Sequence, residues 1–170
     1  PDARRRTVET VASRARDKSG RWPPVIVFPE GTTLNGRALI SFKRGAFEPG
    51  EPVQPVAVTL PWRRVGGCGL DCSWTTAGPQ LFELVGRMML QPWNRMRVEF
   101  LPLYAPDAAE AANPALFARG VRECMSRAMR VPTTEHSWAD MCVKDTRGCR
   151  FSDSRNLRFV VSLSSLRYLK

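Results

Sequence analysis

The alternation of apolar and polar residues predicts β-strands at three places in the first part of the chain. Residues 25–28 form a short run of β-branched and aromatic side chains, which is typical of a buried strand. Residues 53–58 form a second, largely apolar run, and residues 96–103 form a third segment, which alternates apolar and polar side chains over its first five residues. Pro29 ends the first strand, because proline has no amide hydrogen to donate to a sheet.

Three further segments have the apolar spacing of helices. Residues 7–18 carry an apolar stripe opposite a basic face. Residues 79–90 are apolar almost all round, so this helix belongs either in the core or against a membrane, and the core is the default. Asn113 and Pro114 begin a third helix that runs to about Met129, because asparagine caps a helix well and proline suits its first position.

The last part of the chain differs in character from the rest. Residues 144–170 are basic and rich in serine and arginine. Leu157, Phe159, Val161 and Leu163 alternate as in a strand, whereas leucines at 163, 166 and 169 have helical spacing. The pattern leaves both alternatives open.

Candidate chemistry gathers directly after the first strand. Glu30, Gly31, Thr32 and Thr33 bring a carboxylate, a glycine and two hydroxyls to the carboxyl end of a strand, where α/β proteins bind ligands. Gly31 permits a close approach of the backbone to a ligand, and the threonines can donate to phosphate oxygens. A simple turn with a solvated Glu30 is the alternative interpretation.

Composition favours an anionic partner. The net charge is +10 and the sequence pI is about 10.3, which suits a phospholipid surface, the phosphates of coenzyme A or nucleic acid. No zinc-finger or RNP-type motif supports the nucleic-acid alternative. No run reaches 18 apolar residues, so no membrane-spanning helix is expected within these residues. The five cysteines include a Cys68-x-x-x-Cys72 pair that lacks a second ligand pair, so no metal site is expected.

The order of these segments resembles the glycerolipid acyltransferases, the acyl-CoA:lysophospholipid acyltransferase family. Residues 28–32, Phe-Pro-Glu-Gly-Thr, match that family's third motif. Residues 42–47 match a Phe-Lys-x-Gly-Ala-Phe segment, and residues 52–56 match a Pro-Val-x-Pro-Val strand. Both of these are typical of the lysophosphatidylcholine acyltransferase branch, which is the closest branch.

The resemblance implies an α/β fold, namely the C-terminal part of a glycerol-3-phosphate acyltransferase-like three-layer domain with a mixed, mainly parallel sheet. It covers roughly residues 6 to 142. We therefore expect residues 1–142 to form a partial lysophospholipid acyltransferase domain and residues 143–170 to be an unassigned basic tail.

The implied reaction moves a fatty acyl group from acyl-CoA, the co-substrate, to a lysophospholipid hydroxyl, with no other cofactor. The residues that the resemblance assigns to binding the acceptor are Glu30, Gly31, Thr32 and Thr33, with Arg37 and Lys43 as candidate phosphate-binding cations. Pro55 and Val56 are expected to shape the acyl or coenzyme A pocket.

The catalytic motif of the family, His-x-x-x-x-Asp, does not occur in these residues. The only histidine, His136, is followed by Asp140 after three residues instead of four, with Met141 in the place that the motif requires. We therefore expect no catalytic residue here and little or no transferase activity from this chain alone. The alternative is a non-catalytic relative that binds phospholipid or acyl-CoA.

The same resemblance predicts a membrane-associated protein. The endoplasmic reticulum is the expected compartment, with the lipid droplet and the Golgi as alternatives, and attachment is expected through segments upstream of this chain. The expected partners are acyl-CoA, a lysophospholipid and a membrane surface, and not nucleic acid.

Overall fold

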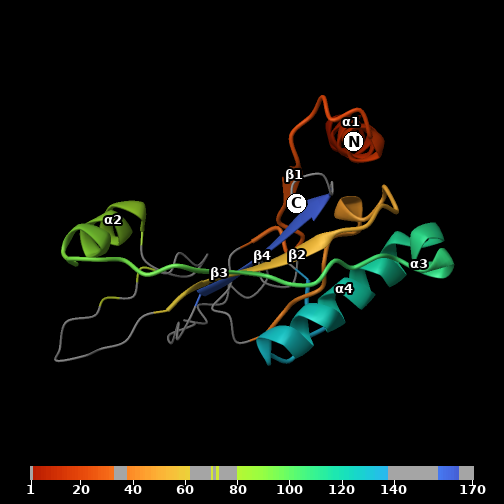
Figure 1. Cartoon of the computed structure of the whole chain (residues 1–170). Helices are drawn as coiled ribbons and strands as arrows, with labels where there is room; N and C mark the ends of the chain where they lie inside the picture. Colours follow the sequence, from red (N-terminus) through yellow and green to blue (C-terminus); the bar gives the residue numbers. More distant parts are fainter. Residues whose placement is uncertain are drawn as a thin grey trace.

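The computed structural model describes residues 2–32, 38–61, 70, 72, 80–137 and 157–164, in which short helices surround one small sheet (Figure 1). In chain order the elements are α1 (Asp2–Arg16), β1 (Val25–Val27), the 3-10 turn η1 (Arg44–Ala46), β2 (Gln54–Leu60), α2 (Leu81–Met89), β3 (Arg97–Phe100), α3 (Ala108–Ala112), α4 (Pro114–Met129) and β4 (Leu157–Ser164).

The sheet has the strand order β1-β4-β2-β3. Strand β4 runs antiparallel to both β1 and β2, and β2 runs antiparallel to β3. The expected mixture of helices and strands is therefore confirmed. The expected mainly parallel sheet and three layers are not, because neighbouring strands of the described sheet pair only in antiparallel fashion. The reason is the position of β4: it lies between β1 and β2, which point the same way, and runs against both.

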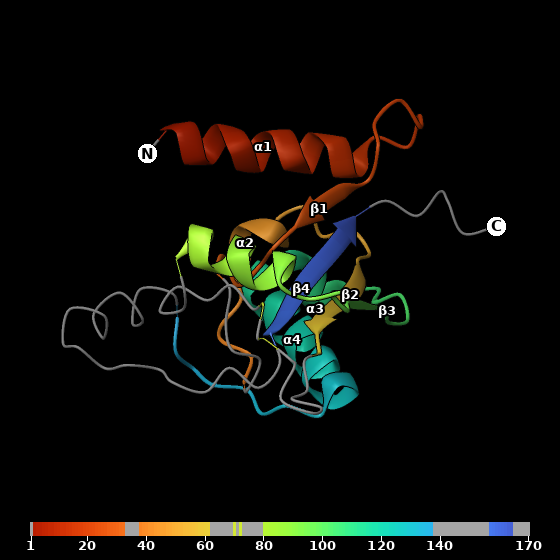
Figure 2. The same ribbon diagram turned by 90° about the vertical axis from the view of Figure 1, so that its left-hand side faces the viewer.

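The register divides the sheet into two faces. Ala57 lies opposite Glu99 on one face, and Val58 lies opposite Val98 on the other. Helix α4 packs on the Ala57 face, where the core lies (Figure 2). The buried members of this core are Leu39, Phe42, Phe47, Val53, Ala57, Leu101, Phe117, Ala118, Val121 and Met125.

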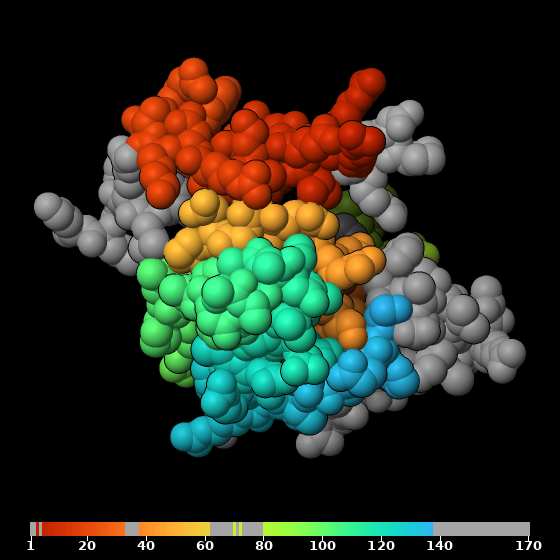
Figure 3. All heavy atoms as spheres, turned by 90° about the vertical axis from the view of Figure 1, so that its right-hand side faces the viewer, coloured from red at the N-terminus to blue at the C-terminus, as the bar shows by residue number. Residues whose placement is uncertain are grey.

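Helix α4 forms as its sequence predicts. The Asn113 side-chain oxygen accepts from the backbone N–H groups of Ala115 at 3.0 Å and Leu116 at 3.4 Å. This cap satisfies donors that would otherwise have no partner inside the helix. Phe117, Val121 and Met125 follow one another at a spacing of four and bury the same face of the helix. Figure 3 shows α4 and α3 side by side, with α1 lying across the top of the molecule.

Helix α3 was not predicted from the sequence. Its signal is a capping box: the Asp107 carboxylate accepts from the Glu110 N–H at 2.7 Å, and the Glu110 carboxylate accepts from the Asp107 N–H at 3.2 Å. The helix is five residues long, too short to show an apolar period. Its start signal was therefore more informative than its hydrophobic pattern.

Helix α2 forms where it was expected but does not lie in the core. Leu84 is its one buried residue. In Figure 1 the helix stands apart from α1, α3 and α4, on the side where the chain enters β3. The default assignment of this helix to the core is therefore wrong for the described part of the chain.

Candidate functional site

A tight turn at the end of β1 carries the first group of expected site residues. The Gly31 N–H donates to the Phe28 carbonyl at 3.1 Å, and the backbone of Gly31 has φ of +68°. This left-handed conformation favours glycine, because a side chain would crowd the following carbonyl. The Lys43 N–H donates to the Pro29 carbonyl at 2.7 Å, which ties the turn to the segment before η1. We call residues 29–32 the elbow.

Glu30 is buried inside the elbow rather than solvated. Its side chain is 3% exposed, and the Ile40 backbone N–H donates a hydrogen bond to its carboxylate. The other carboxylate oxygen, Oε1, has no hydrogen-bond partner in the described structure. Burial disfavours the charged form and raises the pKa of Glu30 to about 8. At neutral pH this carboxyl group is therefore mostly protonated and uncharged.

Gly31 also makes room for a lysine. A Cβ atom added at Gly31 would overlap the Nζ and Cε atoms of Lys43, so the lysine side chain lies directly against the glycine. Gly31 and Lys43 are both exposed, and Thr32 is half-buried beside them. The structure therefore brings Glu30, Gly31, Thr32 and Lys43 together. Thr33 and Arg37 lie outside the described residues, and their assignment stays a prediction.

Pro55 and Val56 lie side by side in β2 and are both buried. Their side chains belong to opposite faces of the sheet, because successive residues of a strand alternate. Val56 lies opposite Phe100, and the Pro55 carbonyl accepts from the Leu101 N–H at 2.9 Å. Their proposed part in an acyl or coenzyme A pocket is not tested by these contacts and stays a prediction.

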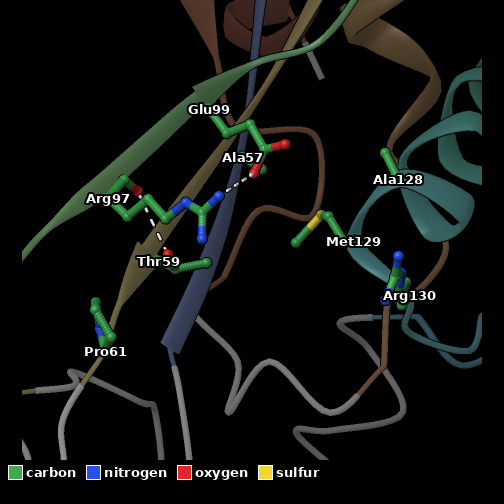
Figure 4. Close-up of a pocket in the computed structure, with 8 residues that line it drawn as sticks. All are labelled: Ala57, Thr59, Pro61, Arg97, Glu99, Ala128, Met129 and Arg130. Atoms are coloured by element: carbon green, nitrogen blue, oxygen red, sulfur yellow. Dashed lines mark hydrogen bonds and ion pairs between the residues drawn. The ribbon is translucent and has the colours of Figure 1, made fainter.

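A cavity of about 520 Å³ opens on the Ala57 face of the sheet, the face to which Pro55 also belongs, but farther along β2 (Figure 4). Its lining residues are Ala57, Thr59, Pro61, Arg97, Glu99, Ala128, Met129 and Arg130. Arg97 and Glu99 form an ion pair at 3.7 Å on the strand side. Met129 and Arg130, from the end of α4, form the facing side in Figure 4. Neither Pro55 nor Val56 lines this cavity.

Arg122 is a buried cation that the sequence analysis missed. Its guanidinium donates to the Thr134 carbonyl at 2.9 Å, the Ser41 hydroxyl at 3.2 Å and the Glu135 carboxylate at 2.8 Å. These bonds connect α4 to the segment that carries Ser41 and Lys43, and so help to hold that segment beside the elbow. A signal was present in the sequence, because Arg122 sits among the apolar positions of α4.

His136 is exposed, in agreement with its interpretation as a surface histidine. Its backbone carbonyl accepts from the Ser41 N–H at 2.9 Å. Asp140 lies outside the described residues. Within the described part of the chain no group of histidine, cysteine and carboxylate side chains is arranged to hold a metal ion. The helices of the described residues are also too short or too polar to cross a bilayer.

The chain is similar to known acyltransferases. Residues 2–59 match the family model described as Acyltransferase. The chain is 43% identical over 140 residues to lysophosphatidylcholine acyltransferase 1 of Homo sapiens, an alignment that covers 82% of this chain and 25% of the relative. It is 41% identical over 143 residues to lysophosphatidylcholine acyltransferase of Drosophila melanogaster, with 84% and 26% covered. It is 40% identical over 141 residues to lysophosphatidylcholine acyltransferase 2B of Rattus norvegicus, with 82% and 26% covered.

These alignments cover about a quarter of the length of the curated relatives. No solved structure matches the chain.

Proposed function

The chain belongs to the acyltransferase family, and on this premise we propose that the protein transfers a fatty acyl group from acyl-CoA to the hydroxyl of a lysophospholipid. The names of the relatives support an acceptor like lysophosphatidylcholine. The partners in this proposal are acyl-CoA as co-substrate, the lysophospholipid and a membrane surface. Nucleic acid is not among them.

The observation that carries the proposal is the burial of Glu30, next in sequence to the glycine against which the Lys43 side chain lies. A charged carboxylate would repel the phosphate of the acceptor, but burial keeps Glu30 mostly protonated at neutral pH. The exposed Lys43 supplies positive charge at the surface of the elbow. We assign the phosphate contact to Lys43 and Thr32, and we assign the close approach of the acceptor to the bare backbone of Gly31.

We propose that the proton-abstracting group comes from outside this chain. A hydroxyl is a weak nucleophile at neutral pH, so a general base takes its proton as it attacks the thioester. The 170 residues contain no His-x-x-x-x-Asp motif. In our proposal the base belongs to another part of the longer protein, and these residues supply acceptor binding without turnover of their own.

We also propose a membrane location, because both substrates carry acyl chains that partition into lipid. The endoplasmic reticulum is the first compartment to examine, followed by the lipid droplet and the Golgi. Fluorescence microscopy of the tagged full-length protein with markers for the three compartments tests this assignment. A diffuse signal that overlaps no membrane marker contradicts it.

Binding at the elbow is tested by Gly31→Ala. The added methyl group forces the Lys43 ammonium away and strains a backbone with φ of +68°. We expect the affinity of the chain for a fluorescent lysophosphatidylcholine, kept below its micelle concentration, to fall about tenfold or more, which corresponds to the loss of one charge-assisted contact.

Gly50→Ala is the matched control. Gly50 has φ of +67°, but an added Cβ there would contact the Ala111 carbonyl at 3.1 Å instead of a lysine. It therefore carries similar backbone strain without disturbing Lys43. Equal losses of affinity in the two variants would show that strain alone is responsible and would refute the site.

Turnover separates the enzyme from a non-catalytic binder. The full-length protein is compared with the 170-residue chain for transfer of a labelled acyl group from acyl-CoA to lysophosphatidylcholine. We expect transfer by the full-length protein and none above blank by the chain. Binding without transfer in both would favour the non-catalytic alternative.

A further inference from the structure

Helix α2 and the segment that follows it expose an unusual amount of apolar surface. Phe82 is 87% exposed and Met89 is 81% exposed, although both lie in a regular helix. Leu90 is 79% exposed and Trp93 is 66% exposed in the segment that leads to β3. We call residues 81–96 the α2 arm. Monomeric soluble proteins rarely leave so many large apolar side chains together in water, so this surface points to a partner.

The two most exposed side chains of the helix, Phe82 and Met89, share one face. Phe82, Val85, Gly86 and Met89 have the i, i+3, i+4, i+7 spacing of a single helical stripe. A Cβ atom added at Gly86 would meet nothing within 4 Å, so the middle of this stripe is open. Leu84 faces the other way and is buried. Helix α2 is therefore anchored on one side and unpartnered on the side of Phe82 and Met89.

Charge distinguishes among the possible occupants of this face. Arg87 pairs with Glu83 at the edge of the stripe, Arg95 follows within the arm, and Arg97, just after the arm, pairs with Glu99. Arginines flanking an apolar stripe keep their charges in water while the stripe enters an apolar phase. Trp93 fits the same boundary, because tryptophan is enriched where apolar and aqueous regions meet. The net charge of +10 adds long-range attraction to an anionic surface.

We propose that the α2 arm lies in the interfacial layer of an anionic phospholipid bilayer, with Phe82 and Met89 directed into the acyl region. The helix has nine residues and so spans about 14 Å, which is enough to lie in the interface and too short to cross the bilayer. The choice of lipid as partner rests on the proposed function, since an enzyme that acylates lysophospholipids must reach its acceptor in a membrane.

The probe is a set of unilamellar vesicles, made either of phosphatidylcholine alone or of phosphatidylcholine with phosphatidylserine. Sedimentation with the vesicles measures how the whole chain partitions between water and lipid. We expect binding to the vesicles that contain phosphatidylserine and at least tenfold weaker binding to the neutral ones, because each arginine near an anionic surface strengthens binding on the order of fivefold. Added salt weakens the binding further.

Phe82→Ser combined with Met89→Ser tests the apolar face. Both side chains are exposed, so the double substitution removes no core contact. We expect it to weaken partitioning into anionic vesicles about tenfold or more, because the variant has much less apolar side-chain area to transfer from water into the bilayer. Leu116→Ser on α4 is the matched control: this leucine is also exposed but lies outside the arm, and its loss leaves partitioning unchanged.

Brominated lipids report on depth. Bromine atoms in the acyl chains quench a tryptophan only when it lies in the bilayer. The other four tryptophans of the chain lie outside the arm. We expect quenching in the wild-type chain and a smaller quenched fraction in Trp93→Phe, which retains an aromatic side chain and still binds. Binding of Trp93→Phe with unchanged quenching would overturn the placement of the arm.

Two further results would overturn the proposal. One is the absence of vesicle binding. The other is self-association of the chain that the double variant abolishes, since the face would then be occupied by a second copy. Acyl-CoA and lysophospholipid are left out of these assays. Failure here therefore leaves the result at Gly31 standing, and failure of the elbow leaves the vesicle result standing.

Discussion

Replacing Glu30 with glutamine is expected to remove a large part of the pH dependence of stability of this chain. The glutamine side chain is nearly the same size as the protonated carboxyl group and remains neutral at every pH. In the native protein the pKa of Glu30 is raised from 4.5 to about 8, with burial as the main cause. In the unfolded chain the carboxyl group returns to an ordinary pKa near 4.5.

The sign follows from proton binding. Between these two pKa values the native state holds a proton that the unfolded state has lost, so the free energy of unfolding falls as the pH rises. The contribution is fully present below about pH 4.5 and is lost as the pH passes through about 8. Each pH unit in this window is worth about 1.4 kcal/mol. From pH 6 to pH 9 the wild type should therefore lose roughly 2–3 kcal/mol through Glu30 alone, because the slope flattens as the pH passes the native pKa.

The assay is urea unfolding at pH 6 and pH 9, followed by tryptophan fluorescence and by circular dichroism. With an m value of about 2 kcal/mol/M, the wild-type midpoint should fall by about 1.3 M more than the midpoint of Glu30→Gln. All other titratable groups are present in both proteins and cancel in the difference. Glu135→Gln provides the control, because the Glu135 side chain is 85% exposed and its variant should follow the wild type.

The reasoning is refuted if wild type and Glu30→Gln lose the same stability between the two pH values. A steeper loss in the variant would refute it as well. Either result would mean that the Glu30 carboxyl group is ionised in the folded elbow at neutral pH. The electrostatic argument for binding a phosphate beside it would then fail.

Two further comparisons use paired substitutions and chemical unfolding. Arg122→Gln is expected to lower the free energy of unfolding by about 2–4 kcal/mol, because it removes a buried cation that donates to three acceptors. Glu135→Gln is expected to lower it by less than about 1 kcal/mol, because that carboxylate is largely in water. Similar losses in the two variants would show that the ion pair contributes more than the two other buried hydrogen bonds. Gly120→Ala is expected to destabilise by about 1–3 kcal/mol, because its methyl group overlaps the Tyr104 hydroxyl where that hydroxyl bonds to a carboxylate. Gly86→Ala, in open space on α2, is expected to be neutral or to stabilise by up to about 1 kcal/mol, and a loss there would contradict the open face.

Local features of the fold were predictable because their causes lie close together in the sequence. The cap of α4 needs only Asn113, Pro114 and the next turn, so its start was assigned correctly. The turn after β1 needs Pro29 and Gly31, and both stand at the end of an apolar run. In each case the residues that decide the structure are neighbours, and no distant partner is required.

Strand order was harder, because it depends on partners far apart in the chain. Alternation marked residues 157–163 as a possible strand, but nothing local indicated that β4 would enter between β1 and β2. The exposure of α2 had the same cause. Periodicity shows which face of a helix is apolar, and what covers that face is decided elsewhere in the molecule.

The candidate site was predicted in composition but not in its electrostatics. The sequence brought Glu30, Gly31 and Thr32 together and suggested Lys43 as a cation. It did not show that Glu30 is buried, because that depends on Ile40 and on the segment before η1. It also missed Arg122, whose partners come from residues 41, 134 and 135.

The position of β4 has a consequence for the order in which the chain acquires its structure during synthesis. Val25 to Val27 take their strand partners from Ser162 to Ser164, more than a hundred residues later. A ribosome will therefore have added more than a hundred further residues before β1 finds its neighbour in the sheet. Until then β1 presents an unpaired edge, which other nascent chains can join. Chaperones that bind extended segments would therefore need to protect β1 until β4 has been synthesised.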